Sequence, residues 1–313
     1  MNFVQLIDGL KISEHLLSDI RQEVSKLSPK PMLAIVYTGQ NAASEIYVNK
    51  KMEAAKSVGI ETELIRLSDT DTKELLAVTK TLNGRDEITG YIAQLPLQKN
   101  IDKKTVLRSI APEKDVDGLS PINLGRLWHG QKCLKSATAL AVVECLKYVA
   151  KYADGKYEVN ELEDGEALLE DYLKGKSVLI INDSLLVGKP LGAIMLTNLA
   201  TVTIANKHTN ERNLKKFTSR ADAIITATGQ PGLITSDMVH NGQVLIDVGI
   251  NKTALGVGGD IDPKGLESKN VWYTPVPNGV GPITVAMLLQ NTLLAYKTNI
   301  LSSKHEQTKP KKN

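Results

Sequence analysis

The feature that most constrains the fold is the alternation of short β-branched runs with longer amphipathic runs along the chain. This alternation is typical of a parallel sheet whose faces are covered by helices. Before residue 139 it predicts strands at 32–37, 61–65 and 90–94 and helices at 10–27, 42–58, 73–82 and 101–110. From residue 139 on it predicts helices at 139–150, 186–199 and 282–296 and strands at 178–181, 201–205, 223–226 and 244–248. The sequence therefore predicts an α/β fold.

The length of the chain indicates more than one domain. A chain of 313 residues with 42% hydrophobic content can bury large cores and exceeds the usual size of a single domain. We expect two α/β domains flanking a cleft. The first would comprise residues 1–138 together with the final helix, 282–298. The second, residues 139–281, has the strand spacing of a Rossmann-like nucleotide-binding sheet.

Two polar segments fall outside this pattern. Residues 151–172 are rich in Asp and Glu, and we interpret them as an insertion on the solvated surface rather than as a docking surface for a basic partner. The Lys-rich end of the chain, 302–313, is expected to be disordered.

Composition argues against several classes of protein. A formal net charge of +3 and an aromatic content of 4% give little basis for nucleic-acid binding. Cys133 and Cys145 are too few for a disulfide framework, and the histidines lack partners at metal-ligand spacing. The N-terminus lacks the pattern of a signal segment, and no run approaches the ~20 apolar residues of a membrane span. We therefore expect a cytoplasmic protein without a metal site.

Four polar residues form the main candidate site. On the predicted helix 42–58, Tyr47 and Lys51 are four residues apart and share one face, which would place a phenol and an ammonium together. Gln94 ends an apolar strand and Asp117 lies in a polar turn, positions where active-site groups often lie. A tyrosine and a lysine at this spacing are more often an exposed helical pair. Their occurrence together with Gln94 and Asp117 favours a site.

The segments around these residues resemble the folate-site motifs of the bifunctional methylenetetrahydrofolate dehydrogenase and methenyltetrahydrofolate cyclohydrolase family. The family motifs Tyr-x-x-x-Lys, Gln-Leu-Pro-Leu and Lys-Asp-Val-Asp-Gly stand unbroken at 47–51, 94–97 and 114–118. The resemblance extends over nearly the whole chain, apart from the acidic segment and the tail.

The resemblance implies a role for each of the four residues. Lys51 would be the proton-handling group, because burial in a cleft would lower the pKa of its ammonium. Gln94 would orient the Lys51 amine, Tyr47 would pack against the pterin and p-aminobenzoyl groups, and Asp117 would accept hydrogen bonds from the pterin. The other substrate-binding residues that the resemblance implies are Pro277 and Gly281.

The nucleotide-binding motifs of the family are altered in this chain. The family's Gly-Arg/Ala-Ser-x-x-Val-Gly-x-Pro is here Asn-Asp-Ser-Leu-Leu-Val-Gly-Lys-Pro at 182–190. Asn182 would manage a turn that favours positive φ, and the following helix would still offer backbone N–H groups to a pyrophosphate. Asp183 stands where the family often has an Arg that pairs with the 2′-phosphate of NADP, and Lys207 is the only obvious cation near the second strand end. The cofactor-binding residues that the resemblance implies are Asn182, Asp183, Ser184, Val187, Gly188, Lys207, Thr228, Gly229 and Ile250.

Two further departures lie outside that motif. Asn278 stands where the family usually has a Gly, and Ser-Ala-Thr-Ala at 136–139 replaces the family's Pro-Cys-Thr-Pro. The folate motifs are thus better preserved than the nucleotide motifs.

The resemblance implies a homodimeric enzyme that interconverts methylene-, methenyl- and formyltetrahydrofolate, with NADP as the hydride acceptor and NAD as an alternative. Because Asp183 opposes Lys207, we expect weak nucleotide binding, little preference between NADP and NAD, and hydrolysis faster than oxidation. Two alternatives stay open. One is a cyclohydrolase alone with a weakened nucleotide site, and the other is a catalytically silent folate-binding paralogue.

Overall fold

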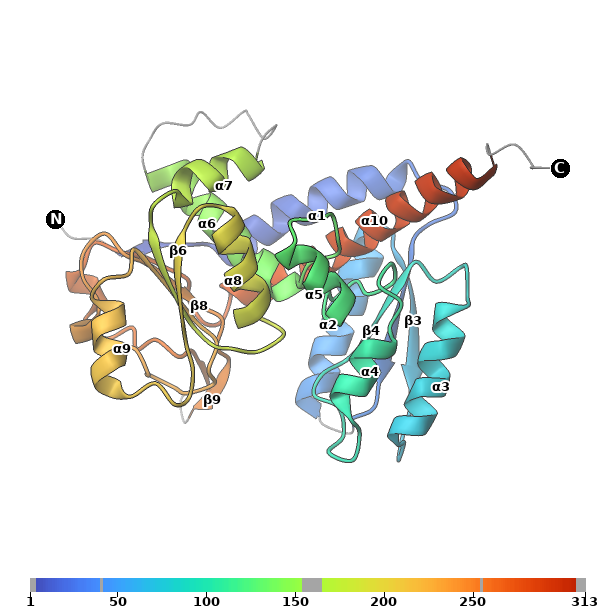
Figure 1. The fold of residues 1–313 in the computed structure, drawn as a ribbon, viewed down its shortest axis with the longest axis horizontal. Helices are drawn as coiled ribbons and strands as arrows, with labels where there is room; N and C mark the ends of the chain where they lie inside the picture. Colours follow the sequence, from blue (N-terminus) through green and yellow to red (C-terminus); the bar gives the residue numbers. More distant parts are fainter. Residues whose placement is uncertain (1–3, 40–41, 154–164, 254–255, 308–313) are drawn as a thin grey trace. The chain divides into compact units, whose positions relative to one another are not determined.

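The computed structural model describes residues 4–39, 42–153, 165–253 and 256–307. They form two compact units, each an α/β structure built on a parallel sheet (Figure 1). The six-stranded unit combines the residues up to Glu14 with Thr138–Thr284, and the three-stranded unit combines His15–Ala137 with the residues from Val285 on. The predicted α/β fold with two domains is confirmed.

The three-stranded unit is organised around β2 (Met32–Tyr37), whose residues 33–36 are fully buried. β3 (Glu61–Arg66) pairs with one edge of β2 and β4 (Gly90–Ala93) with the other, both in parallel. Because the chain leaves β2 on one side and returns on the other, the carboxyl ends of β2 and β4 form a topological switch point, where α/β proteins bind ligands. The helices that begin and end within this unit are α2 (Ala42–Val58), α3 (Thr72–Asn83), α4 (Lys103–Ser109) and α5 (Pro121–Trp128).

The six-stranded unit has the strand order β1-β11-β8-β7-β5-β6, and every neighbouring pair is parallel. The strands are β1 (Gln5–Leu6), β5 (Ser177–Ile181), β6 (Thr201–Ala205), β7 (Ala223–Thr226), β8 (Val244–Asp247) and β11 (Trp272–Tyr273). Since β5 lies between β6 and β7, the carboxyl ends of β5 and β7 form a second switch point. The remaining elements of this unit are α7 (Gly165–Leu173), α8 (Gly188–Thr197), α9 (Glu211–Thr218), the short 3-10 helices η1 (Ser236–Met238) and η2 (Leu266–Ser268), and the antiparallel pair β9 (Asn251–Thr253) and β10 (Gly256–Gly258).

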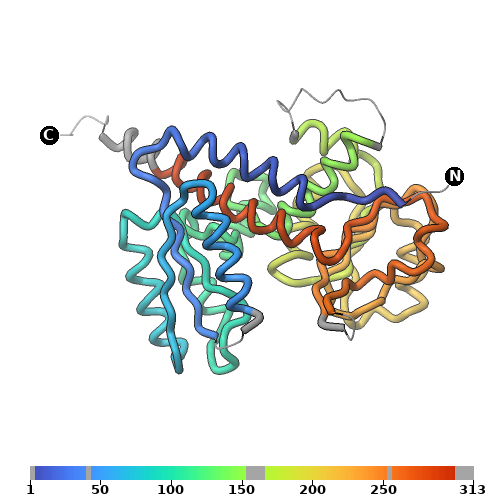
Figure 2. Tube along the Cα trace, turned by 180° about the vertical axis from the view of Figure 1, so that it is seen from behind, coloured from blue at the N-terminus to red at the C-terminus, as the bar shows by residue number. Residues whose placement is uncertain are grey.

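Three helices carry the chain from one unit into the other: α1 (Gly9–Ser25), α6 (Ala137–Ala153) and α10 (Val280–Gln307). Within the three-stranded unit α10 runs beside α1 (Figure 2), and Lys297 Nζ lies 2.8 Å from Glu23 Oε2. Tyr296 of α10 donates its phenolic hydrogen to the carbonyl of Pro29 at 2.6 Å. The last helix therefore returns to the first domain, as predicted. Among the helices of the described residues, none has the length and apolar composition needed to span a membrane.

The expected domain limits differ from the structure at the two chain ends. The first residues associate with the six-stranded unit, because β1 pairs with β11 and adds a strand to its sheet. At the other end the expected disordered tail from residue 302 is wrong for residues 302–307, which continue α10. Residues 308–313 lie outside the described part of the chain.

The expected acidic insertion, 151–172, is wrong in its extent. α6 continues to Ala153, and α7 occupies residues 165–173 with Leu169 and Leu173 buried. A helix that buries two leucines is part of the packed unit rather than a solvated loop. The central part of the insertion, 154–164, lies outside the described residues.

Candidate functional site

Lys51 and Gln94 meet at the switch point of the three-stranded sheet. Lys51 lies on α2, the helix that follows β2, and Gln94 follows β4 directly. The Lys51 ammonium donates to Gln94 Oε1, with 2.9 Å between the two atoms. Gln94 is only 8% exposed, and its Nε2 donates to the carbonyl of Leu95 at 2.7 Å. The amide is therefore held with its oxygen toward Lys51.

Asp117 is the charged partner of Lys51. Both side chains are half-buried. Burial lowers the pKa of the Lys51 ammonium from its ordinary value of 10.5, and the negative charge of Asp117 offsets part of this effect. Burial also raises the pKa of the Asp117 carboxyl above 3.8, and Lys51 acts in the opposite direction. An amine whose pKa is lowered is neutral over a wider pH range, so it can accept a proton.

Tyr47 lies one turn before Lys51 on α2 and is 40% exposed. An exposed aromatic ring one helical turn from a half-buried amine can pack against a flat ligand. The structure thus brings Lys51, Gln94 and Asp117 together and leaves the ring of Tyr47 accessible.

The loop that carries Asp117 is held by two residues that the sequence analysis missed, Asp115 and Asn291. Asp115 accepts from the backbone N–H of Leu119 at 3.1 Å and of Ser120 at 2.8 Å. Asn291, on α10, donates from Nδ2 to the carbonyls of Val116 and Lys135, both at 2.8 Å. Asp115 could have been found, because it lies within the motif at 114–118. For Asn291 the sequence shows only a polar residue within an apolar helix, which does not indicate a contact with this loop.

We predict that Asn291→Leu weakens both the fold and folate binding. The substitution leaves the two carbonyls without their donor in a buried place, which costs about 1–3 kcal/mol of unfolding free energy. Thermal unfolding and folate titration would measure the two effects. The exposed neighbour Gln290 supplies the control, since Gln290→Leu breaks no such contact. Equal stability and equal folate affinity in the two variants would contradict the positioning role of Asn291.

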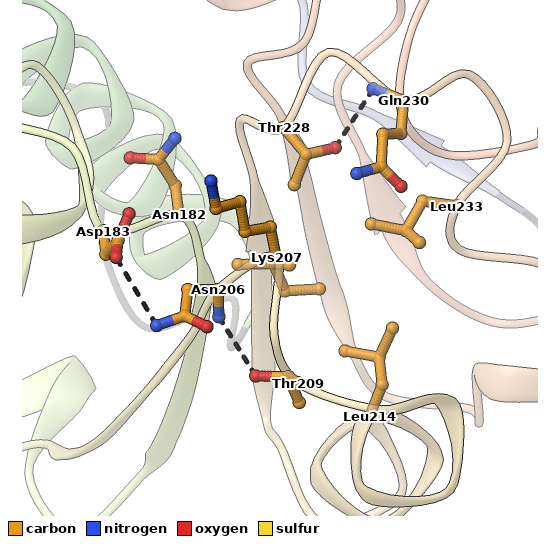
Figure 3. Close-up of a pocket in the computed structure, with 10 residues that line it drawn as sticks. Asn182, Asp183, Asn206, Lys207, Thr209, Leu214, Thr228, Gln230 and Leu233 are labelled. Atoms are coloured by element: carbon orange, nitrogen blue, oxygen red, sulfur yellow. Dashed lines mark hydrogen bonds between the residues drawn. The ribbon is translucent and has the colours of Figure 1, made fainter.

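A pocket of about 230 Å³ lies at the carboxyl ends of β5, β6 and β7 (Figure 3). Its lining residues come from the end of β5, from the loops after the three strands and from the first part of α9: Ile181, Asn182, Asp183, Asn206, Lys207, Thr209, Leu214, Thr228, Gln230 and Leu233. This is the switch point of the six-stranded sheet, where dinucleotides bind in Rossmann-like folds. Four of the expected cofactor residues, Asn182, Asp183, Lys207 and Thr228, therefore line one pocket.

Asn182 holds the loop that leads from β5 into α8. The expectation of a positive φ is wrong, because Asn182 is absent from the left-handed residues of the described chain. Its side chain holds the loop through hydrogen bonds instead: Oδ1 accepts from the N–H of Ser184 at 2.8 Å and of Gly188 at 3.1 Å. Ser184 Oγ in turn accepts from the N–H of Val187 at 3.2 Å. Several N–H groups expected to face a pyrophosphate are thus engaged within the loop.

Gly188 has a steric reason to be glycine. A Cβ at this position would lie 1.8 Å from the carbonyl oxygen of Asn182. The close approach lets the start of α8 fold back onto the end of β5.

The loop after β7 is fixed by a buried carboxylate. Thr228 donates from Oγ1 to Asp260 Oδ2 at 3.0 Å, and its Oγ1 accepts from the N–H of Gln230 at 3.1 Å. Gly229 has φ +72°, which a glycine adopts without strain. Ile250 follows β8 and is 51% exposed. The Thr228 hydroxyl therefore shapes the pocket wall through Asp260.

Comparison with known proteins identifies the family. Residues 7–117 match the catalytic domain, and residues 167–300 the NAD(P)-binding domain, of tetrahydrofolate dehydrogenase/cyclohydrolase. The bifunctional protein FolD of Sulfurihydrogenibium sp. is 39% identical over 302 residues, which cover 95% of this chain and 99% of that protein. The chain belongs to the tetrahydrofolate dehydrogenase/cyclohydrolase family. Most of the residues that match the family's NAD(P)-binding domain lie in the six-stranded unit, and those after Thr284 lie in the three-stranded unit.

Solved structures of family members have the same fold. The bifunctional FolD of Campylobacter jejuni is 35% identical with a TM-score of 0.85, over 95% of this chain and 99% of that one. The dehydrogenase-cyclohydrolase of Trypanosoma brucei, solved with NADP and an inhibitor, is 28% identical with a TM-score of 0.83, over 96% of this chain and 99% of that one. The family's NAD(P)-binding domain begins at residue 167, so most of α7 belongs to it.

The remaining expected residues lie around the start of α10, with Pro277 in the loop before it and Gly281 in its first turn. Pro277 and Gly281 lie in the six-stranded unit, and their contact with substrate remains a prediction. Between them Asn278 has φ +74°, a conformation that Asn tolerates better than most residues other than Gly. Asn can therefore replace the family's usual Gly at this position.

Proposed function

We propose that the protein interconverts methylene-, methenyl- and formyltetrahydrofolate through an NAD(P)-dependent dehydrogenase activity and a cyclohydrolase activity. The observation that carries this proposal is the 2.9 Å contact of Lys51 Nζ with Gln94 Oε1 beside Asp117, within the family's catalytic domain. A silent folate-binding protein has no use for a buried amine with a lowered pKa. The geometry therefore favours an enzyme over a silent paralogue.

Hydrolysis needs a base and an oriented substrate. As water attacks the cationic methenyl carbon, the neutral amine of Lys51 takes a proton from that water, and a C–O bond forms. Lys51 then passes this proton to the ring nitrogen as the C–N bond breaks. The hydroxyl of the intermediate loses its own proton as the formyl C=O forms, which leaves formyltetrahydrofolate and one released proton. Gln94 holds the amine in place, Asp117 accepts hydrogen bonds from the pterin, and Tyr47 packs against its plane.

Oxidation requires mainly orientation from the protein. A bound NAD(P) would supply the acceptor for the hydride of the methylene carbon. The pocket at the ends of β5, β6 and β7 suits a dinucleotide, because it combines the apolar side chains of Leu214 and Leu233 with the cation of Lys207. No side chain has to exchange a proton in this step, so the residues of this chain contribute binding and alignment.

Two assays on the purified protein test the proposal. Methenyltetrahydrofolate alone should be hydrolysed well above its uncatalysed rate, and methylenetetrahydrofolate with NAD or NADP should yield reduced nucleotide. Hydrolysis without oxidation would favour a cyclohydrolase alone, a candidate supported by the N–H groups that Asn182 already occupies. Absence of both reactions would favour the silent paralogue.

The pH dependence of hydrolysis should report Lys51. Because burial lowers the Lys51 pKa, the rate at saturating substrate should rise with pH to a midpoint below 10.5. Asp117 raises this pKa, so Asp117→Asn should move the midpoint to lower pH. The measurement is the rate against pH for both proteins after subtraction of the uncatalysed rate. A midpoint that stays in place or moves upward in the variant would contradict the coupling of Asp117 to Lys51.

The assembly and location of the protein are separate proposals. We infer from the family resemblance a homodimer in the cytoplasm. Light scattering of the purified protein would measure its mass in solution.

A further inference from the structure

The carboxylate of Asp183 is held toward the end of β6. Asn206, the residue after β6, donates from Nδ2 to Asp183 Oδ2 at 3.4 Å (Figure 3). The other end of the Asn206 amide, Oδ1, accepts from the N–H of His208 at 3.0 Å, which orients the amide. The backbone N–H of Asn206 donates to Thr209 Oγ1 at 3.1 Å. The exposed carboxylate of Asp183 thus lies beside the end of β6.

The end of the second strand is the place where Rossmann-like folds read the adenosine ribose. An acidic side chain there accepts from the ribose 2′-hydroxyl of NAD, whereas a cation pairs with the 2′-phosphate of NADP. In chain order from β5, β6 is the second strand of this sheet. A carboxylate has about four acceptor sites. Asn206 uses one of those on Asp183, so the carboxylate can also accept from ribose hydroxyls.

A 2′-phosphate fits this position poorly. A phosphate monoester carries a charge of about −1.5 to −2 near neutral pH and has little hydrogen to donate. Beside Asp183 the 2′-phosphate would face a carboxylate of the same charge. It would also offer acceptor oxygens where the 2′-hydroxyl of NAD offers a donor. The interaction is repulsive for NADP and attractive for NAD.

Lys207 is placed to act on a different part of the nucleotide. In the view of Figure 3 its ammonium lies between Asn182 and Thr228, which follow β5 and β7. The pyrophosphate of a dinucleotide binds at this switch point. Since Asn182 and Ser184 already accept backbone N–H groups of the loop, a cation there would contribute to pyrophosphate binding. NAD and NADP share the pyrophosphate, so Lys207 would strengthen both without choosing between them.

We propose that Asp183, positioned by Asn206, accepts the 2′-hydroxyl of the adenosine ribose and makes NAD the preferred hydride acceptor of this chain. The inference rests on the proposed function and adds the choice of nucleotide. It also replaces the expectation of little preference between NADP and NAD. That expectation assumed that Asp183 and Lys207 act as opposite charges at similar distances from the 2′-phosphate. In the proposed arrangement Asp183 contacts the ribose and Lys207 the pyrophosphate.

Calorimetric titration of the full-length protein tests the inference without relying on activity. We expect NAD to bind about tenfold or more tightly than NADP, and ADP-ribose to bind more tightly than its 2′-phosphorylated form by a similar factor. Asp183→Asn should lower both ratios by about tenfold. Added salt should reduce the preference of the wild type, because screening weakens repulsion of the phosphate. Glu267→Gln removes an exposed carboxylate that does not line the pocket and should leave the ratios unchanged.

The outcomes separate this inference from the function on which it rests. Tighter binding of NADP than of NAD, or ratios that Asp183→Asn leaves unchanged, would overturn the role of Asp183 while the dehydrogenase assignment stands. Failure of both nucleotides to bind would overturn the inference and the dehydrogenase half of the proposed function together. Hydrolysis of methenyltetrahydrofolate, measured without nucleotide, reports the cyclohydrolase half independently.

Discussion

Lys51→Met should lower the rate of methenyl hydrolysis by about 100-fold or more, the usual contribution of a positioned proton acceptor. Met has a similar length and no group that can take a proton, so Gln94 loses its donor and Asp117 loses the positive charge near it. The measurement is the hydrolysis rate at saturating methenyltetrahydrofolate, after subtraction of the uncatalysed rate.

The matched control is the neighbouring lysine. Lys50 is exposed on the same helix, and Lys50→Met should hydrolyse methenyltetrahydrofolate at close to the wild-type rate. Thermal unfolding of Lys51→Met checks that the variant is folded, because the substitution removes an ammonium that burial disfavours and also leaves Gln94 Oε1 without its donor. Near-normal hydrolysis by a folded Lys51→Met variant would rule out Lys51 as the proton acceptor.

Asp117→Ala should weaken folate binding by about 1–3 kcal/mol, or roughly 5- to 150-fold in the dissociation constant. In the proposed site, the substitution would leave the amino and ring N–H groups of the bound pterin without their acceptor. Fluorescence titration with a folate that is not turned over would measure the affinity.

Two further variants sharpen this test. Asp117→Asn keeps one acceptor oxygen and should bind folate more tightly than Asp117→Ala. Glu113, an exposed acid four residues earlier, serves as the control, and Glu113→Ala should leave the affinity unchanged. If Asp117→Ala binds folate as tightly as Glu113→Ala does, Asp117 lies outside the folate site.

Much of the fold could be predicted because its central elements have strong periodic patterns. β2 and α2 have the predicted limits, 32–37 and 42–58, since an uninterrupted buried run and several helical turns leave little ambiguity. α5 and α9, of eight residues each, were missed. β1 was also missed, because its two residues have no pattern of their own and form a strand only by pairing with β11.

The site residues that lie in local sequence motifs could be predicted. The contacts between segments that are far apart in sequence could not. Lys51 and Gln94 stand in recognisable motifs, and the structure joins them. Asn291 contacts Val116 across 175 positions of sequence, which no local pattern can reveal. For Asn182 the residue type suggested a backbone turn with positive φ. In the structure its side-chain oxygen Oδ1 instead accepts two backbone N–H groups of the loop.

One time course tests most directly whether this chain is a bifunctional enzyme. Methylenetetrahydrofolate and NAD are mixed with the wild-type protein, and reduced nucleotide and methenyltetrahydrofolate are followed in the same sample. We expect reduced nucleotide to appear while methenyltetrahydrofolate stays low, because hydrolysis consumes it faster than oxidation supplies it. Methenyltetrahydrofolate that accumulates in equal amount with reduced nucleotide, or no reduced nucleotide with either NAD or NADP, would contradict a bifunctional enzyme.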